Sequence, residues 1–181
     1  MKSFISSEMR RLALTLFIIT AVIALMLAFT YESTKGIIAD KKNREIEISL
    51  SSAIPEATDF MLYTPTTPTS DKIQQAYVAK KGSEKIGYGV LAYADGYSST
   101  SMLLLVATDM DRTITSVSVL ETLETKGIGS EVDTPDYLDQ FIGVHGSIGN
   151  DVKIITTATV SSKAVMECVQ TVLDFLIEVP Q

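Results

Sequence analysis

Cysteine and histidine are almost absent from this sequence, and their scarcity excludes several kinds of chemistry. The 181 residues include one cysteine, Cys168, and one histidine, His145. A lone cysteine cannot form an internal disulfide, hold an iron–sulfur cluster or complete a CxxCH haem attachment motif. His145 lies in the glycine-rich stretch GVHGSIG, where we expect a solvated loop side chain rather than a ligand or a base. The sequence therefore predicts no metal site and no catalytic residue.

Basic residues are too few to form a nucleic-acid-binding face. The chain has 15 lysines and arginines against 22 aspartates and glutamates, and its formal net charge is −7. Nucleic-acid binding needs a basic patch, so we expect no nucleic-acid partner. The glycine motifs GxGxxG and GxxxxGK[ST] are also missing from the sequence. Nucleotide binding of the Rossmann or P-loop kind is therefore not indicated.

Apolar residues, in contrast, are abundant and concentrated in one run. The hydrophobic fraction is 46 % and the mean hydropathy is +0.24. From Leu12 to Phe29 no residue is charged, and the polar residues are Thr15 and Thr20. These residues, as a helix, would span about 27 Å, enough to cross a hydrocarbon core. A cleaved signal peptide is the alternative, but it has a shorter apolar run and a small-residue cleavage site, so an uncleaved anchor is favoured.

The charges that flank this run indicate an orientation. Lys2, Arg10 and Arg11 precede it, so the positive-inside rule places the N-terminus in the cytoplasm, although lysines also follow the run. We therefore expect a single-pass protein of the inner (cytoplasmic) membrane whose C-terminal domain is extracytoplasmic. The expected segments are a cytoplasmic N-terminus at 1–11, a transmembrane helix at 12–31, a connecting helix and loop at 32–70, and the extracytoplasmic domain at 71–181.

The pattern of the remaining chain predicts an α+β fold. Strand-like runs at 74–81, 86–94, 101–108 and 113–122 are joined by short turns, which favour an antiparallel meander. A connecting helix should end before Pro55. A short helix is expected within 133–143, capped by Asp133 or Thr134. A long amphipathic helix should begin near Ser161 or Ser162 and pack on the sheet.

Two stretches carry residues suited to a phosphate-bearing ligand. In ETKGIGSEV, residues 124–132, Gly127 and Gly129 would let a backbone approach a ligand closely. In residues 156–162, five hydroxyl side chains precede the last helix, and Lys163 follows them. A helix N-terminus gathers unpaired N–H groups that favour an anion. The alternatives are an ordinary loop for the first stretch, and a strand end with a helix cap for the second.

Both stretches are similar to motifs of the FMN-binding-domain family. Residues 124–129, ETKGIG, resemble the family's E-T-P-G-L-G, and residues 156–165, TTATVSSKAV, resemble its S-G-A-T-x-[S/T]-S-[K/x]-[A/G]-V. GYGVLAYADGYSS and AIPEATDF also look like family stretches. The chain most resembles the G subunits of Rnf ion-translocating electron-transport complexes. The related C subunit of the sodium-pumping NADH:quinone reductase is longer.

This resemblance implies a cofactor, partners and a function. FMN would be attached covalently to Thr159 by a phosphoester bond, transferred from FAD by a flavin maturation transferase. The chain would carry electrons in a membrane-bound ferredoxin:NAD+ oxidoreductase coupled to sodium or proton translocation, with the other membrane subunits as partners and no enzyme activity alone. The implied flavin-binding residues are Thr159, Glu124, Thr125, Gly127, Ile128, Gly129, Thr156, Thr157, Ala158, Val160, Ser161 and Lys163.

The sequence also departs from the family pattern. Thr157 stands where the family has glycine, Lys153 where it has aspartate, and Lys126 where its loop has proline. Ser99 and Arg112 replace glycines that are usual in the strand turns. These departures motivate a second interpretation, a flavin-free scaffold subunit of the complex. A third interpretation is a solitary membrane-tethered flavoprotein.

Overall fold

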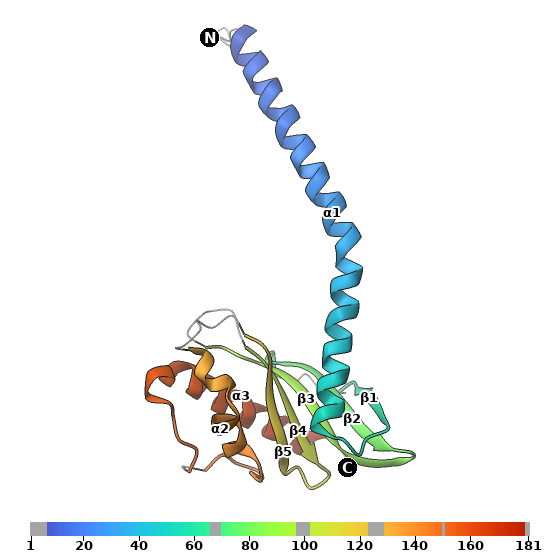
Figure 1. Ribbon diagram of the computed structural model, residues 1–181, viewed down its shortest axis with the longest axis vertical. Helices are drawn as coiled ribbons and strands as arrows, with labels where there is room; N and C mark the ends of the chain where they lie inside the picture. Colours follow the sequence, from blue (N-terminus) through green and yellow to red (C-terminus); the bar gives the residue numbers. More distant parts are fainter. Residues whose placement is uncertain (1–6, 66–69, 97–101, 123–128, 150, 180–181) are drawn as a thin grey trace. The chain divides into compact units, whose positions relative to one another are not determined.

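The computed structural model describes residues 7–65, 70–96, 102–122, 129–149 and 151–179 (Figure 1). The contacts within the chain divide it into two units, one ending at Arg44 and the other beginning at Glu45.

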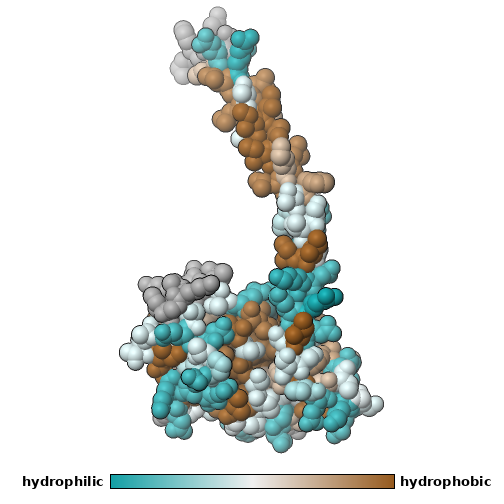
Figure 2. All heavy atoms as spheres, viewed as in Figure 1, coloured by the Kyte–Doolittle hydropathy of each residue, from teal (hydrophilic) through white to brown (hydrophobic). Residues whose placement is uncertain are grey.

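The first unit consists of most of one long helix, α1, which runs from Ser7 to Ala53. Among the described residues this is the one helix long and apolar enough to cross a membrane. Figure 2 shows its apolar residues as a continuous band. The hydroxyls of Thr15 and Thr20 donate to the backbone carbonyls of Arg11 and Leu16, one turn back. The polar groups inside the apolar run are thus satisfied by the helix itself, as a hydrocarbon environment requires.

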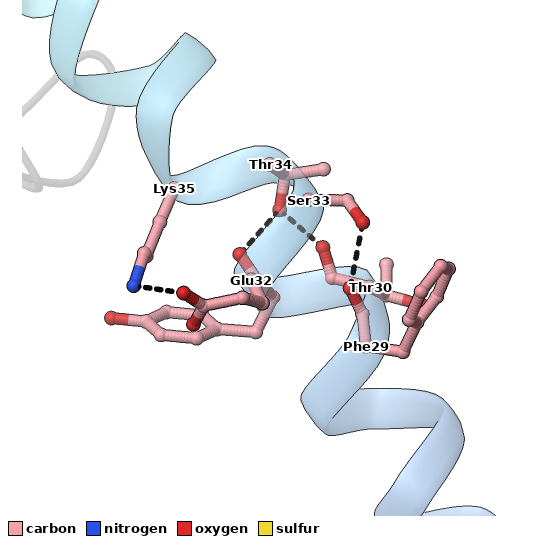
Figure 3. A network of polar contacts seen from close by, with 7 residues as sticks. Phe29, Thr30, Glu32, Ser33, Thr34 and Lys35 are labelled. Carbon is pink, nitrogen blue, oxygen red and sulfur yellow. Dashed lines mark hydrogen bonds and ion pairs between the residues drawn. The ribbon is translucent and has the colours of Figure 1, made fainter.

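The apolar band of α1 ends in a short polar segment (Figure 3). Ser33 donates to the Phe29 carbonyl at 2.9 Å, and Thr34 donates to the Thr30 carbonyl at 2.8 Å. Lys35 forms an ion pair with Glu32 one turn away. This segment marks the boundary between the apolar run and the charged C-terminal part of the helix.

The expected transmembrane and connecting helices form one continuous helix. No proline lies between Leu12 and Pro55, so nothing in that stretch removes a helical N–H donor. The helix ends at Ala53, which confirms the expected end before Pro55.

The second unit is built around an antiparallel sheet with the strand order β1-β2-β3-β4-β5. This order confirms the predicted meander. The strands are β1 (Asp59–Tyr63), β2 (Ile73–Lys81), β3 (Glu84–Ala94), β4 (Met102–Asp109) and β5 (Ile114–Glu121). The sheet includes a strand that the sequence pattern missed, β1, which lies within the stretch expected to connect the anchor to the domain.

After β5 the chain forms short helical turns and one long helix. These elements are η1 (Gly129–Asp133), α2 (Pro135–Leu138), η2 (Asp139–Phe141), η3 (Thr156–Ala158) and α3 (Thr159–Glu178). The predicted helix within 133–143 is therefore real, but it is divided into α2 and η2. Thr134 precedes it and Pro135 is its first residue, as expected.

The two faces of the sheet pack against different helices. On one face, alternate residues such as Val90, Leu104 and Val106 form the main core with α3 (Figure 1). The predicted apolar stripe of α3 is buried there; it consists of Val165, Val169, Val172, Leu173 and Leu176. On the other face, the last turns of α1 bury Ile46 and Leu50 against a smaller cluster of leucines. The α+β architecture predicted from the sequence is confirmed.

One glycine in β3 makes this second contact possible. A Cβ atom at Gly89 would lie 2.3 Å from the Leu50 side chain, so only glycine allows Leu50 to pack so closely on the strand. The end of α1 is therefore part of the folded domain rather than a separate linker.

Candidate functional site

The hydroxyl-rich stretch forms a tight turn that leads into α3. Residues 156–158 are the 3₁₀ turn η3, which the Ala158 N–H closes by donating to the Ile155 carbonyl at 3.0 Å. The helix α3 begins at Thr159, with Ala158 as its N-cap residue. The expected start near Ser161 or Ser162 is therefore wrong by two to three residues. The hydroxyls at 161 and 162 do not cap the helix, because both residues already belong to it.

Thr159 is the first residue of the helix and its side chain is exposed. Its hydroxyl donates to the Thr156 carbonyl at 3.0 Å, which fixes the oxygen at the surface and leaves its lone pairs open. Ala158 has only a methyl side chain, so it cannot accept a bond from the N–H groups of the first helical turn. Lys163, one turn further along the same helix face, is also exposed. An exposed hydroxyl, uncapped N–H groups and a cation thus occur together, and they suit a phosphate ester.

The two stretches singled out in the sequence meet in the structure. The turn η1 contacts the turn η3. The Thr157 hydroxyl donates to the carboxylate of Glu131, which joins the two turns directly. Gly129, the last residue of the ETKGIG stretch, is buried at the start of η1. The end of the glycine loop therefore lies beside the turn that precedes Thr159.

The other predicted site residues divide by their exposure. Thr156 and Thr157 are exposed, and Val160 is 49 % exposed. Ala158 and Ser161 are buried at 3 % and 2 % exposure, so their side chains belong to the interior of the domain. Four predicted flavin contacts lie outside the described residues, namely Glu124, Thr125, Gly127 and Ile128. Two of the departures from the family pattern, Lys126 and Ser99, also lie outside them.

Two further departures, at Lys153 and Arg112, lie within the described residues. Lys153 is exposed and its backbone N–H donates to the Gln140 side-chain oxygen at 2.9 Å. Arg112, in the turn between β4 and β5, has a φ of 64°. That left-handed conformation is one that glycine adopts without strain, which agrees with the glycine expected there.

Sequence reasoning gave no role in supporting the turn to Glu131, Tyr137 and Gln140, and it assigned Ser162 to the helix start instead. Ser162 is fully buried, and its hydroxyl accepts the Ile155 N–H at 3.2 Å. The Tyr137 hydroxyl donates to the Ser162 carbonyl at 2.9 Å. Burial raises the pKa of Tyr137, so this hydroxyl keeps its proton at neutral pH and remains a donor. The sequence carried no local signal for this role, because a serine at an expected helix start indicates a cap.

Neither Cys168 nor His145 contributes to this site. Burial raises the pKa of the Cys168 thiol to about 12, which makes it unreactive. His145 is exposed in its loop. Within the described residues, no group of three or more histidine, cysteine, aspartate or glutamate side chains could hold a metal ion. The site's distinctive chemical group is therefore the hydroxyl of Thr159.

Comparison with protein families gives two matches along the chain. The profile of the FMN-binding domain matches residues 96–174, which include Thr159 and both sequence stretches. The profile of the RnfG N-terminal region matches residues 1–51, which include the apolar run.

Individual relatives match over most of their length. A Methanosarcina acetivorans protein, named as the G subunit of an ion-translocating oxidoreductase complex, is 26 % identical, and the match covers 94 % of this chain and 96 % of that protein. An Acetobacterium woodii protein, named as the G subunit of a Na(+)-translocating ferredoxin:NAD(+) oxidoreductase complex, is also 26 % identical, with 86 % and 85 % covered. The crystal structure of Shewanella oneidensis NqrC superposes with a TM-score of 0.45 and 20 % identity, over 65 % of this chain and 66 % of that one.

Proposed function

The chain belongs to the RnfG family, whose members carry an FMN-binding domain, and from this we propose that it is an electron-carrying subunit of an ion-translocating oxidoreductase complex. FMN is bound covalently through Thr159 in this proposal. The observation that carries it is the exposed Thr159 hydroxyl at the uncapped start of α3, inside the matched FMN-binding domain.

Attachment would proceed by transfer of FMN from FAD, catalysed by a separate flavin maturation transferase. The Thr159 oxygen forms a bond to the phosphorus of the FMN half, and the bond from that phosphorus to the AMP oxygen breaks. AMP leaves, and the threonine proton is released to a base of the transferase or to water. The reaction neither consumes nor produces electrons.

The residues around Thr159 would then hold the resulting phosphodiester. The N–H groups of the first turn of α3, which no side chain caps, would favour its negative charge. Lys163 supplies a positive charge one turn away. Residues 124–129 are proposed to lie against the flavin ring, where glycines permit close backbone approach. The bound FMN would supply the redox chemistry, and the protein would hold, orient and tune it.

The complex would oxidise reduced ferredoxin, reduce NAD+ and drive sodium ions or protons out of the cell. This subunit would relay electrons between other membrane subunits. The helix α1 anchors it in the membrane, and we propose that its N-terminus is cytoplasmic and its domain extracytoplasmic, because Arg10 and Arg11 precede the apolar run. Outside the cytoplasm a covalent bond would prevent loss of a cofactor that no nearby pool replaces.

A denaturing gel viewed for flavin fluorescence tests the proposal. The full chain is expressed with and without a flavin transferase and FAD, and only a covalent flavin survives denaturation. We expect a fluorescent band that depends on the transferase. A dark band in both cases would favour the flavin-free scaffold, which Thr157 and Lys153 motivate. Purification from native membranes without any other subunit would favour the solitary flavoprotein.

A further inference from the structure

We infer that Ser162 is a positioning residue for flavin attachment. Its buried hydroxyl holds the turn from which Thr159 is presented to the transferase. This inference rests on the proposed function. Ser162 is 0 % exposed, so its side chain lies beneath the protein surface and would contact neither the flavin nor its phosphate.

The Ser162 hydroxyl joins α3 to the chain that precedes η3. Helical serines commonly donate back to a carbonyl three or four residues earlier, and such bonds hold nothing outside the helix. The Ser162 hydroxyl instead accepts the N–H of Ile155, seven residues earlier and outside the helix. Ile155 is the residue from which η3 starts. The bond therefore ties the beginning of the turn to the first turn of α3.

Hydrogen bonds within the turn connect Ile155 to Thr159. The Ile155 carbonyl accepts the Ala158 N–H at 3.0 Å, which closes η3. The Thr156 carbonyl, within the same turn, accepts the Thr159 hydroxyl at 3.0 Å. The rotamer of the proposed acceptor hydroxyl thus depends on the position of a carbonyl in this turn. The Ser162 hydroxyl holds Ile155, the residue that directly precedes this turn.

Ser162 is itself held in place by Tyr137. Its carbonyl accepts the hydroxyl of Tyr137 at 2.9 Å, and Tyr137 is 2 % exposed. The Tyr137 ring packs edge-on against Phe141, with ring centroids 5.6 Å apart. Gln140, on the same short helical segment, accepts the Lys153 N–H at 2.9 Å. The segment 135–141 thus fixes both Ser162 and the chain that enters the turn.

The consequence is kinetic. A transfer reaction needs its nucleophile within a few tenths of an ångström of the productive position, and a misplacement of about 1 Å costs on the order of 100-fold in rate. Removing the Ser162 hydroxyl leaves the Ile155 N–H without its buried partner, so the turn gains alternative positions. We expect Ser162→Ala to slow FMN transfer onto the full chain at least tenfold.

The test compares Ser162→Ala with Val172→Ala, a matched destabilising control in the same helix. Val172 is also 0 % exposed but belongs to the main core between the sheet and α3. Truncating it lowers the stability of the fold without removing a hydrogen bond of the turn. Initial rates of transfer are measured on the full chain with transferase and FAD at a temperature where both variants are folded. We expect Val172→Ala to stay within twofold of wild type. Equal rates for both variants, whether normal or slow, would overturn the inference.

A second readout uses the chain without flavin. Hydrogen exchange of the Ile155 and Ala158 amides should accelerate in Ser162→Ala and remain unchanged in Val172→Ala. If wild type accepts no flavin, the proposed function fails, but exchange still decides whether Ser162 holds the turn. If Ser162→Ala does not fold, Tyr137→Phe removes only the hydroxyl behind Ser162. That variant should slow transfer several-fold, and an unchanged rate would overturn the inference.

Discussion

The hydroxyl of Thr159 is the residue-scale feature on which the account depends. Thr159 is exposed and is the first residue of α3, and its hydroxyl donates a hydrogen bond to the Thr156 carbonyl. Neighbouring hydroxyls are committed elsewhere, since Thr157 binds Glu131 and Ser162 binds the backbone of Ile155. Thr156 is exposed as well, so what distinguishes Thr159 among the exposed threonines of this stretch is its place as the first residue of α3.

Replacing Thr159 by valine should abolish covalent flavin and leave the fold intact. The side chain is exposed and the hydrogen bond that it loses is the one to the Thr156 carbonyl, so the free energy of unfolding should fall by no more than about 1 kcal/mol. Thr159→Ser keeps the hydroxyl and should retain flavin. In-gel fluorescence and thermal unfolding measure the two effects, and covalent FMN in the valine variant would refute the assignment.

Arg112 gives a second prediction at this scale. Its φ of 64° strains any residue except glycine, while its guanidinium donates to the Val179 carbonyl at 3.1 Å. Arg112→Ala loses the hydrogen bond and keeps the strain, whereas Arg112→Gly loses the bond and relieves it. Chemical denaturation should therefore find the glycine variant more stable than the alanine variant by about 1 kcal/mol. The opposite order would show that the turn is not strained.

At the scale of elements, the contact between η1 and η3 brings the two motif stretches together. The backbone of Glu131 is held as well as its side chain, because the Thr134 hydroxyl donates to the Glu131 carbonyl at 2.8 Å. Thr157, which stands where the family has glycine, therefore adds a link between the turns. This link gives the departure a structural role that is compatible with an exposed Thr159.

Thr157→Val should loosen this link, and Thr157→Ser should preserve it. Loss of one hydrogen bond to a partly exposed carboxylate should lower the free energy of unfolding by about 1 kcal/mol. Thr156 lies in the same turn and is also exposed, so Thr156→Val is the matched control. It should change the free energy of unfolding by less than about 0.5 kcal/mol. Urea denaturation distinguishes them, and equal values for the two valine variants would contradict the role given to Thr157.

The elements also show how far sequence patterns reach. The four strands of the meander that the sequence predicted, and the apolar stripe of α3, follow from periodicity and short turns, so they could be predicted. The strand β1 was missed because it is short and lies at the edge of the sheet, where Met61 and Leu62 are exposed and give no clear alternation. The start of α3 was misplaced because serines usually cap helices, whereas here tertiary bonds use Ser162. Contacts such as Thr157 with Glu131 join residues 26 apart, and no local pattern reports them.

At the scale of the whole molecule, the chain combines a helix able to span a membrane with a domain that has its own core. The last turns of α1 belong to that core through Ile46 and Leu50. The domain therefore cannot be cut at Ala53 without exposing the leucine cluster beneath it. Deleting residues before Arg44 should leave the core complete.

The buried and partly buried tyrosine and cysteine side chains of the domain predict how its stability responds to alkaline pH. Burial raises the pKa of Tyr77, Tyr88 and Tyr137, and it raises that of Cys168 to about 12. A group whose pKa is raised on folding stabilises the fold below its unfolded pKa, and this contribution is lost as the pH rises through the folded value. The melting temperature should therefore fall as the pH rises above about 9.

The share of Cys168 in this decline can be isolated. Cys168→Ala removes the thiol, so its melting temperature should fall less steeply between pH 9 and the region of the thiol's raised pKa of about 12. Because the substitution also leaves a small cavity, the slopes rather than the absolute temperatures are compared. Parallel slopes for wild type and variant would exclude a contribution from the thiol.

The most direct measurement is mass spectrometry of the peptide that contains Thr159, taken from the chain purified with its native membrane complex. The account predicts that this peptide carries the mass of FMN less one water, with the modification on Thr159. A peptide that is entirely unmodified would contradict the account and leave a membrane-anchored α+β domain without its redox group.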